Sequence, residues 1–284
     1  MRLARIRRTP EGPVELAAAL DDQTLISLRD VDAGADPVAA LDRLGADGLA
    51  DETARRAESA DRLTASDVIF QTPVASCSKV CCLALNYRSH AEESSLDVPP
   101  VPVLFFKPPS ALIGHGAPVR PPRRTRHVEH EVELAVVIGR RCRDVPEEDW
   151  ADVVAGYTIV NDMTARDLQL ESMRRQEPWD HSKAFDTFAP LGPFLVTPDE
   201  VPDPHALSMT LTVDGEVRQR AHTGDMVHPI PKLIADLTDG MTLLPGDVIA
   251  TGTTAGIAPV RDGDVMHAHI DGLGTLVSPV QWAN

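Results

Sequence analysis

Three glutamates alternate with other residues in one segment, Val128-Glu129-His130-Glu131-Val132-Glu133-Leu134. Residues two apart share a face of a strand, so Glu129, Glu131 and Glu133 would project together while His130 points away. Neighbouring carboxylates repel one another unless a cation or bound protons compensate their charge. An exposed acidic edge also fits this pattern. The apolar run at 135–138 weakens that alternative, because it indicates that the strand becomes buried.

Asp162 supplies a further carboxylate. It follows a strand-like segment at 156–161 and precedes a helix-like segment that begins at Met163, so it could simply cap that helix. Taken with Glu131 and Glu133, it instead offers three oxygen ligands and leaves positions for water. Such a ligand set favours Mg²⁺ or Mn²⁺ over zinc, which prefers nitrogen and sulfur.

A histidine and a glutamate three residues apart, His90 and Glu93, follow a predicted strand at 80–85. One turn of helix makes such residues neighbours. A carboxylate beside an imidazole orients it and raises its basicity, as a general base near neutral pH requires. On spacing alone, a surface pair without function is the more common occurrence. Prolines at 99, 100 and 102 indicate a loop over residues 88–102, which we interpret as a lid.

Lys183 is one of only four lysines and lies among aromatic residues in the segment 179–188. In a pocket it would stabilise a developing enolate or carboxylate charge, whereas at the surface it would be an ordinary exposed lysine. A glycine-rich turn at 252–256 follows a predicted strand at 247–251, and its amides and hydroxyls could hold a carboxylate. Such turns are common, so this second feature is weak by itself.

The charge balance limits the partners of the protein. Its 284 residues include 27 basic and 43 acidic ones, which gives a net charge of −16. Nucleic acid and anionic membrane surfaces attract the opposite charge, so we expect neither as a partner. No apolar run has the length of a membrane-spanning helix, and residues 1–8 lack the apolar core of an export signal. Four cysteines without paired spacing favour free thiols in the cytoplasm.

Short apolar runs separated by Gly and Pro indicate the fold class. They predict strands at 80–85, 103–106, 132–138, 155–160, 192–196, 209–213, 247–251 and 265–270. Helical patterns cover 37–44, 51–63, 149–154, 164–174 and 230–237. We therefore predict an α+β fold that is predominantly β. A small N-terminal α+β subdomain over 1–72 and a main domain over 73–284 would divide at Thr72-Pro73, where proline disfavours helix.

The order of these motifs resembles the fumarylacetoacetate hydrolase family, in the branch of acylpyruvate hydrolases, oxaloacetate decarboxylases and hydroxyhepta-dienedioate isomerases. The resemblance covers roughly residues 78 to 280. It rests on Asn86-Tyr87-x-x-His90-x-x-Glu93, Phe106-Lys107-Pro108, Glu131-Val132-Glu133-Leu134 with Val137-Ile138-Gly139, Gly156-Tyr157-x-x-x-Asn161-Asp162-x-x-Ala165-Arg166-Asp167-x-Gln169, Lys183-x-Phe185-Asp186-Thr187-Phe188, Gly192-Pro193 and Gly252-Thr253-x-Ala255-Gly256.

This resemblance implies a mixed β-sandwich roll of the fumarylacetoacetate hydrolase C-terminal type, with the main domain as the catalytic one. It implies Mg²⁺ or Mn²⁺, with Ca²⁺ as a substitute, held by Glu131, Glu133 and Asp162. The catalytic residues would be His90, Glu93 and Lys183, under a lid that orders on ligand binding. The positions matched around the 2-oxo acid end of the substrate are Tyr87, Arg166, Gln169 and Thr253. Family members of this kind are usually homodimers, so we expect one here.

The substrate implied by the resemblance is a small anionic 2-oxo acid. We expect hydrolysis of a carbon–carbon bond in an acylpyruvate-like acid, through an enolate, ahead of two alternatives. These are tautomerisation of a 2-hydroxy-dienedioate and decarboxylation of an oxaloacetate-like acid. Four positions, Ala84, Glu129, Ala184 and Thr254, depart from the family pattern and bear on the shape of the pocket. A catalytically silent binding protein is less favoured, because every expected charged position is filled.

Overall fold

The structure is a computed structural model that describes residues 1–32, 34–58 and 62–282. Its strands are β1 (Arg2–Arg7), β2 (Glu15–Ala19), β3 (Thr24–Ser27), β4 (Arg62–Thr64), β5 (Ile69–Phe70), β6 (Val80–Ala84), β7 (Val103–Lys107), β8 (Leu112–Ile113), β9 (Val128–Glu129), β10 (Val132–Ile138), β11 (Val154–Asn161), β12 (Thr164–Ala165), β13 (Ala189–Val196), β14 (Ser208–Val213), β15 (Glu216–His222), β16 (Val248–Ala250), β17 (Val265–Ile270) and β18 (Gly274–Pro279). The predominance of strands confirms the predicted fold class.

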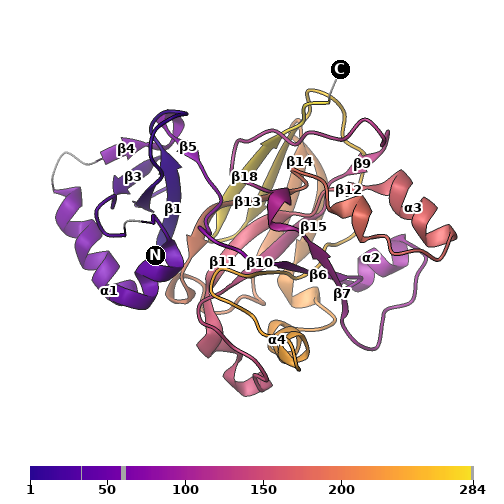
Figure 1. Ribbon diagram of the computed structural model, residues 1–284. Helices are drawn as coiled ribbons and strands as arrows, with labels where there is room; N and C mark the ends of the chain where they lie inside the picture. The colour runs from indigo at the N-terminus through magenta and orange to yellow at the C-terminus, as the bar shows by residue number, and fades with distance from the viewer. Residues whose placement is uncertain (33, 59–61, 283–284) are drawn as a thin grey trace.

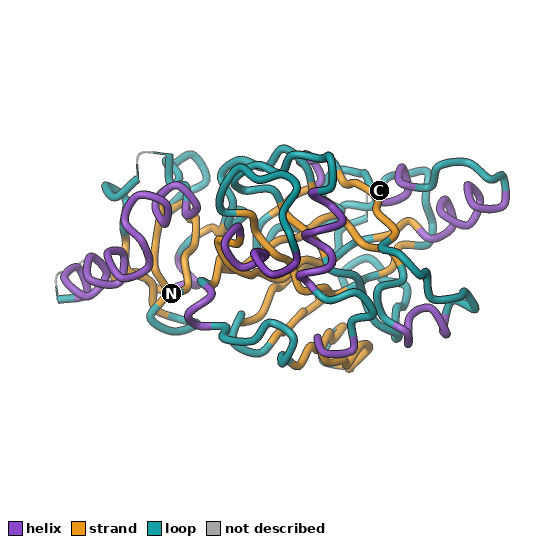
Figure 2. Tube along the Cα trace, turned by 90° about the horizontal axis from the view of Figure 1, so that it is seen from below, coloured by secondary structure: helices purple, strands orange, loops and turns teal. Residues whose placement is uncertain are grey.

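The helices lie around these strands, and α1 occupies one end of an elongated molecule (Figures 1 and 2). The α-helices are α1 (Pro37–Ala57), α2 (Arg88–Glu93), α3 (Arg166–Arg174) and α4 (Ile230–Thr238). Short 3₁₀ helices are η1 (Ala65–Asp67), η2 (Pro109–Ala111), η3 (Glu147–Val153), η4 (Asp180–Lys183), η5 (Pro198–Glu200) and η6 (Thr223–Asp225). Within the described ranges, no helix is long and apolar enough to cross a membrane.

One large sheet runs through the molecule in the order β4-β3-β2-β1-β13-β11-β10-β16-β6-β7, with β5 paired to β1 and β8 to β13. β10 lies between β11 and β16 and is antiparallel to both. All of its residues, from Val132 to Ile138, are buried. A strand that is buried on both faces exposes no side chain to water, so polar residues do not have to alternate with apolar ones. This explains the nearly continuous apolar sequence of β10.

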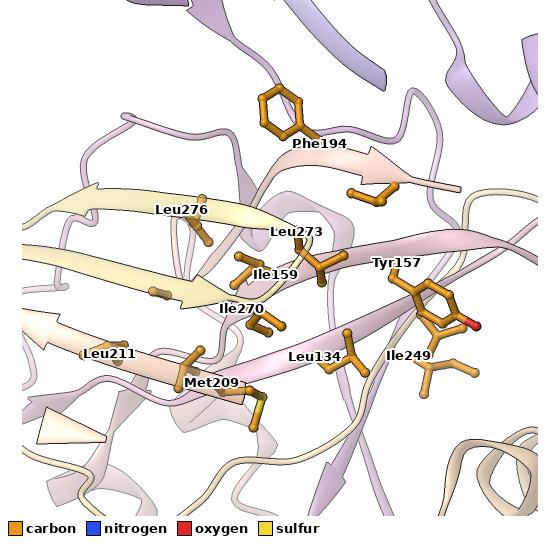
Figure 3. Close-up of a cluster of buried hydrophobic side chains, with 14 of the residues drawn as sticks. Leu134, Tyr157, Ile159, Phe194, Met209, Leu211, Ile249, Ile270, Leu273 and Leu276 are labelled. Atoms are coloured by element: carbon orange, nitrogen blue, oxygen red, sulfur yellow. The ribbon is translucent and has the colours of Figure 1, made fainter. Parts of the chain in front are cut away.

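A second sheet, in the order β15-β14-β17-β18, packs against the large sheet. Met209 and Leu211 of β14 and Ile270 of β17 belong to the same hydrophobic cluster as Leu134 and Ile159 of the large sheet (Figure 3). Burial alternates along β14, as expected for a strand with one face on the core. Removing apolar side chains from water, at about 25 cal/mol per Å², is the main attraction between these layers.

The N-terminal residues form a meander of β1 to β4, with α1 beside it (Figure 1). β1 also pairs with β13, with Arg2 opposite Val196 and Leu3 opposite Leu195. The meander therefore extends the large sheet of the rest of the chain. The division of the chain near residue 72 stays a prediction.

The helices expected at 37–44 and 51–63 form a single element, α1, interrupted at Gly45, whose φ is +67°. The predicted C-terminal end of the second helix is wrong, because Arg62 and Leu63 pair with β3 as part of β4. The intervening residues 59–61 of that prediction lie outside the described residues. Pairing with β3, which is distant in sequence, thus makes Arg62 and Leu63 part of a strand and not the end of a helix.

Two other predicted helices begin or end differently. The helix expected at 149–154 is the 3₁₀ helix η3, and Val154 already belongs to β11. The helix expected at 164–174 begins at Arg166, because Thr164 and Ala165 pair with β9. The predicted strands are all present with bounds close to those expected, and the helix expected at 230–237 is α4.

The four cysteines, Cys77, Cys81, Cys82 and Cys142, form no disulfide, as expected from their spacing. Burial raises the pKa of both Cys77 and Cys81 to about 12. Both side chains are therefore protonated thiols near neutral pH, and neither has the low pKa that reactive cysteines need.

Candidate active site and metal centre

The carboxylates of the candidate site lie where β10 begins and β11 ends. Val132 of β10 is opposite Asn161 of β11. The Asp162 N–H donates to the Glu131 carbonyl at 2.8 Å, and Asn161 Oδ1 accepts from the Glu131 N–H at 2.8 Å. These hydrogen bonds place Asp162 beside Glu131, although the two residues are distant in sequence.

Glu131, Glu133 and Asp162 form a buried acidic cluster. One carboxylate oxygen from each lies within 4.8 Å of the others. Their exposed fractions are 3%, 1% and 1%, so water screens their mutual repulsion poorly. Three hard oxygen ligands that converge on one point are the donor set that Mg²⁺ and Mn²⁺ prefer. The residues present therefore fit the metal expected from the sequence.

Two lysines approach Asp162, one at each carboxylate oxygen. Lys183 Nζ lies 2.6 Å from Asp162 Oδ2 and 2.7 Å from Glu131 Oε2. Lys107 Nζ, from the end of β7, lies 2.6 Å from Asp162 Oδ1. The sequence analysis assigned no role to Lys107. A charged residue that ends an apolar strand, in a chain with four lysines, was the signal that could have identified it.

The buried charges shift one another's pKa values. Burial, together with repulsion from Asp162 and Glu131, raises the pKa of Glu133 well above its ordinary value. Burial would also raise the pKa of Glu131, but attraction by Lys183 and Arg166 outweighs it and lowers that pKa. Burial would lower the pKa of Lys183, and attraction by Asp162 and Glu131 raises it instead. Without a cation of its own, Glu133 therefore favours its protonated form, and a divalent cation at the cluster would stabilise the charged form.

Arg166, at the start of α3, closes another side of the acidic cluster. Its Nε lies 2.6 Å from Glu129 Oε2, and its Nη2 lies 2.5 Å from Glu131 Oε1. Its Nη1 donates to Gln169 Oε1, one helical turn later. His127 Nε2 lies 2.7 Å from the other carboxylate oxygen of Glu129. The guanidinium is therefore fixed between two carboxylates and orients the Gln169 amide.

His90 and Glu93 come from α2, where their spacing brings them to one side of the helix. His90 Nδ1 lies 3.6 Å from Glu93 Oε2, which is longer than a hydrogen bond. Glu93 Oε1 accepts from the Gly256 N–H at 2.9 Å. Over the ranges that the structure describes, His90 Nδ1 has no hydrogen-bond partner. Burial lowers the pKa of His90, which favours the neutral imidazole that a general base needs.

The glycine-rich turn after β16 contacts the acidic cluster through its backbone. The Gly252 N–H donates to Glu133 Oε2 at 2.7 Å. Gly252 has a φ of +100°, and a Cβ there would lie 2.8 Å from a neighbouring side-chain carbon, so the position requires glycine. The Thr253 hydroxyl donates to the Val132 carbonyl and accepts from Gln219 Nε2, both at 2.9 Å. The turn therefore positions Glu133, and the Thr253 hydroxyl is already paired within the protein.

A cavity of about 560 Å³ adjoins the acidic cluster. The expected site residues that line it are His90, Glu93, Glu131, Glu133, Asp162, Arg166, Gln169, Lys183 and Thr253. Tyr87 is not among the described residues that line the cavity, because its side chain is fully buried in the hydrophobic core. The structure thus brings together all the expected site residues except Tyr87, and their roles remain predictions.

Known proteins resemble this chain in sequence and in fold. Residues 79–281 match the family model described as fumarylacetoacetate (FAA) hydrolase C-terminal. An uncharacterized protein of Pyrococcus abyssi is 50% identical over 202 residues, which are 71% of this chain and 89% of that protein. The mitochondrial oxaloacetate tautomerase FAHD1 of Bos taurus is 43% identical over 202 residues, 71% of this chain and 91% of its own.

A solved structure matches over the full length. It is maleylpyruvate hydrolase from Sphingobium sp. SYK-6 in complex with manganese(II) ion and pyruvate, which is 36% identical, with a TM-score of 0.81 and coverage of 100% of both chains. The motifs, the fold and the family match agree, and these relatives with described activities are enzymes. The chain belongs to the fumarylacetoacetate hydrolase family.

Proposed function

We propose that this protein is a divalent-metal-dependent hydrolase that cleaves a carbon–carbon bond in a small 2-oxo acid of the acylpyruvate type. The observation that supports this most directly is the acidic cluster in a cavity that Lys183 and His90 also line. When bound there, Mg²⁺ or Mn²⁺ would supply Lewis-acid polarisation of the 2-oxo acid group. The relative solved with manganese and pyruvate supports both the metal and the acid.

In the proposed hydrolysis, His90 accepts a proton from water, and the oxygen of that water bonds to the acyl carbonyl carbon. The bond between this carbon and C3 of the pyruvate unit then breaks, and its electron pair forms the pyruvate enolate. The imidazolium returns its proton to C3, which yields pyruvate and a carboxylic acid. Lys183 Nζ, which reaches the cluster at 2.7 Å from Glu131 Oε2, would stabilise the charge of the enolate.

Glu93 would orient the imidazole in this scheme. Its distance of 3.6 Å from His90 Nδ1 is long for a hydrogen bond, but catalytic hydrogen bonds often shorten only when substrate is bound. The Gly256 N–H fixes one oxygen of Glu93, so the other oxygen remains free to accept from the ring.

Tautomerisation is the second candidate function. The relative named oxaloacetate tautomerase is 43% identical, and its reaction requires only proton transfer within one 2-oxo acid. The neutral imidazole of His90 would transfer the proton in that reaction without an attacking water. The two candidates differ in their products, because hydrolysis gives two acids and tautomerisation gives an isomer of the same mass.

The first test follows acetylpyruvate after chelation of the protein and again after addition of Mn²⁺, with products measured by NMR. We expect metal-restored formation of acetate and pyruvate. His90→Ala should lower kcat/KM by about 10²–10⁴-fold and leave the Kd for Mn²⁺ unchanged. His269→Ala, which alters an exposed histidine of β17, is the matched control. Full activity of His90→Ala would refute the role of the histidine. Oxaloacetate is assayed in parallel. If oxaloacetate were isomerised or released CO₂ while acetylpyruvate was not turned over, hydrolysis would be refuted.

A further inference from the structure

The cavity beside the acidic cluster has two chemically different ends. At the buried end, Glu133 is 1% exposed and Lys183 is 4% exposed. At the mouth, Leu96, Leu170 and Met173 line the cavity and are 42%, 43% and 41% exposed. A substrate held by its 2-oxo acid group at the buried end would therefore extend along apolar side chains toward the mouth.

An aromatic wall connects the two ends. The Phe105 ring lies 5.0 Å from Lys183 Nζ, and Trp179 packs against it with 4.9 Å between ring centroids. Val103, two residues earlier on β7, also lines the cavity. A charged group that passed along the Phe105 ring and Val103 would lose water without gaining a hydrogen bond or an ion pair from them. The wall is thus suited to an aliphatic or aromatic group.

The cations of the cavity are already paired at its buried end. Among the described lining residues, the arginine and lysine side chains are Arg166 and Lys183, and both form ion pairs with the carboxylates described above. Glu93 adds a further carboxylate, with a side chain that is 34% exposed. A second carboxylate on the substrate would meet this negative charge and apolar side chains, with no cation beside it.

We propose that the preferred substrate is a 2-oxo acid with one carboxylate and an apolar acyl group, which Leu96, Leu170 and Met173 select. This substrate class rests on the function proposed above. It differs from maleylpyruvate and oxaloacetate, the acids named for relatives that are 36% and 43% identical, because each of these carries a second carboxylate. Exchange of the side chains at the mouth would alter this selection without changing the acidic cluster.

The decisive measurement compares two isosteric ligands by calorimetry in the presence of saturating Mn²⁺. These are 6-methyl-2-oxoheptanoate, which ends in an isopropyl group, and 2-oxohexanedioate, which ends in a carboxylate of similar shape. We expect the branched monocarboxylate to bind at least about tenfold more tightly, because it avoids desolvation of an unpaired charge. Equal binding, tighter binding of the dicarboxylate, or failure of both to bind would overturn the proposal.

A lysine at the mouth should change this preference. Met173→Lys is expected to weaken binding of 6-methyl-2-oxoheptanoate and to strengthen binding of 2-oxohexanedioate, so that their Kd ratio falls by at least about threefold. Glu171→Gln on the same helix changes the net charge by the same amount at an exposed position that does not line the cavity. This control should leave the ratio unchanged. A ratio that falls equally in both variants would show that net charge, not the mouth, sets the preference.

Measurements of turnover distinguish a failure of the proposed substrate class from a failure of the proposed hydrolysis. The matched substrates are 7-methyl-2,4-dioxooctanoate and 2,4-dioxoheptanedioate, again with isopropyl and carboxylate ends. We expect kcat/KM to favour the first by at least about tenfold. Faster hydrolysis of the dicarboxylate would overturn the substrate class and leave hydrolysis standing. Hydrolysis of neither, with the calorimetric preference intact, would overturn hydrolysis and leave the selectivity of the cavity standing.

Discussion

Asp162 has a lysine at each of its carboxylate oxygens, and this arrangement compensates the charge of one of the three carboxylates in the buried cluster. Burial lowers the pKa of Lys107, and its attraction to Asp162 opposes that effect. The ammonium also donates to the carbonyls of Met163 and Lys183, so it joins the residues that follow β11 to those of η4. Lys107 thus positions Asp162 and is itself absent from the lining of the cavity in the described structure.

Replacement of Lys107 by methionine removes the charge and keeps much of the side-chain volume. We expect Lys107→Met to lower the free energy of unfolding by about 3–5 kcal/mol, because it leaves one oxygen of the buried Asp162 carboxylate without its cation. Saturating Mn²⁺ should restore part of this loss, because the metal would bind the folded chain. Urea unfolding with and without Mn²⁺ measures both effects.

The control for this experiment is Lys232→Met. Lys232 pairs with Asp236 at 2.7 Å on α4, and both side chains are partly exposed. Its loss should change the free energy of unfolding by less than about 1 kcal/mol. An unfolding midpoint that is the same for Lys107→Met and the unchanged chain would contradict the positioning role of Lys107.

At the scale of the elements, the sequence predicts those strands, helices and side-chain neighbours that depend only on residues close together in the chain. The apolar run of β10 identifies a buried strand, and the spacing of His90 and Glu93 identifies neighbours on α2. The pairing of Thr164 and Ala165 with β9, and the approach of Lys107 to Asp162, depend on segments far apart in the chain. No local pattern contains such contacts, so the sequence could mark Lys107 as an unusual residue but could predict neither contact. Tyr87 shows the opposite case, in which a motif residue packs into the core and does not line the cavity in the described structure.

β16 carries the glycine-rich turn to the acidic cluster, and Asp247 anchors its start. Asp247 Oδ1 accepts from the N–H groups of Ser78 and Lys79 at 2.8 and 3.1 Å. Its Oδ2 accepts from the Leu244 N–H at 2.8 Å and from Lys79 Nζ at 2.6 Å. Burial would raise the pKa of Asp247, but these hydrogen bonds outweigh it and lower that pKa. The charged form of Asp247 is therefore the one that stabilises β16.

We expect Asp247→Asn to lower the free energy of unfolding at pH 7 by about 1.5–3 kcal/mol, because an amide cannot accept all these hydrogen bonds. A lowered pKa in the folded state gives a stabilisation that is present above the unfolded value of about 3.9 and is lost as the pH falls below it. Urea unfolding should therefore show the same difference at pH 7 and pH 5 and a smaller one at pH 3.5. Asp186→Asn, an exposed substitution, is the control. A difference that stayed constant to pH 3.5 would contradict the assignment to the charged form.

At the scale of the whole molecule, the two sheets have edges of different character. On β7, Leu104 and Phe106 are 36% and 40% exposed and alternate with Phe105, which lines the cavity. On β15, Val217 is 46% exposed but stands between charged residues. Long apolar edge strands are normally covered, because their unpaired backbone groups invite association with another chain. The homodimer expected from the family resemblance stays a prediction, and β7 is the edge that we expect it to cover.

One experiment can distinguish β7 from β15 as the edge that forms the dimer interface. The unchanged chain should sediment as a dimer at micromolar concentration, and the double variant Leu104→Lys/Phe106→Lys should sediment as a monomer, since charges on an edge oppose pairing. Val217→Lys places a charge on the other edge and should remain dimeric. Circular dichroism would establish that the double variant is folded. A monomeric unchanged chain would refute the dimer, whereas dissociation caused only by Val217→Lys would assign the interface to the four-stranded sheet. Because Phe105 and Val103 of the same strand line the cavity, dissociation at β7 should also weaken binding of the apolar acid, and dissociation at β15 should not.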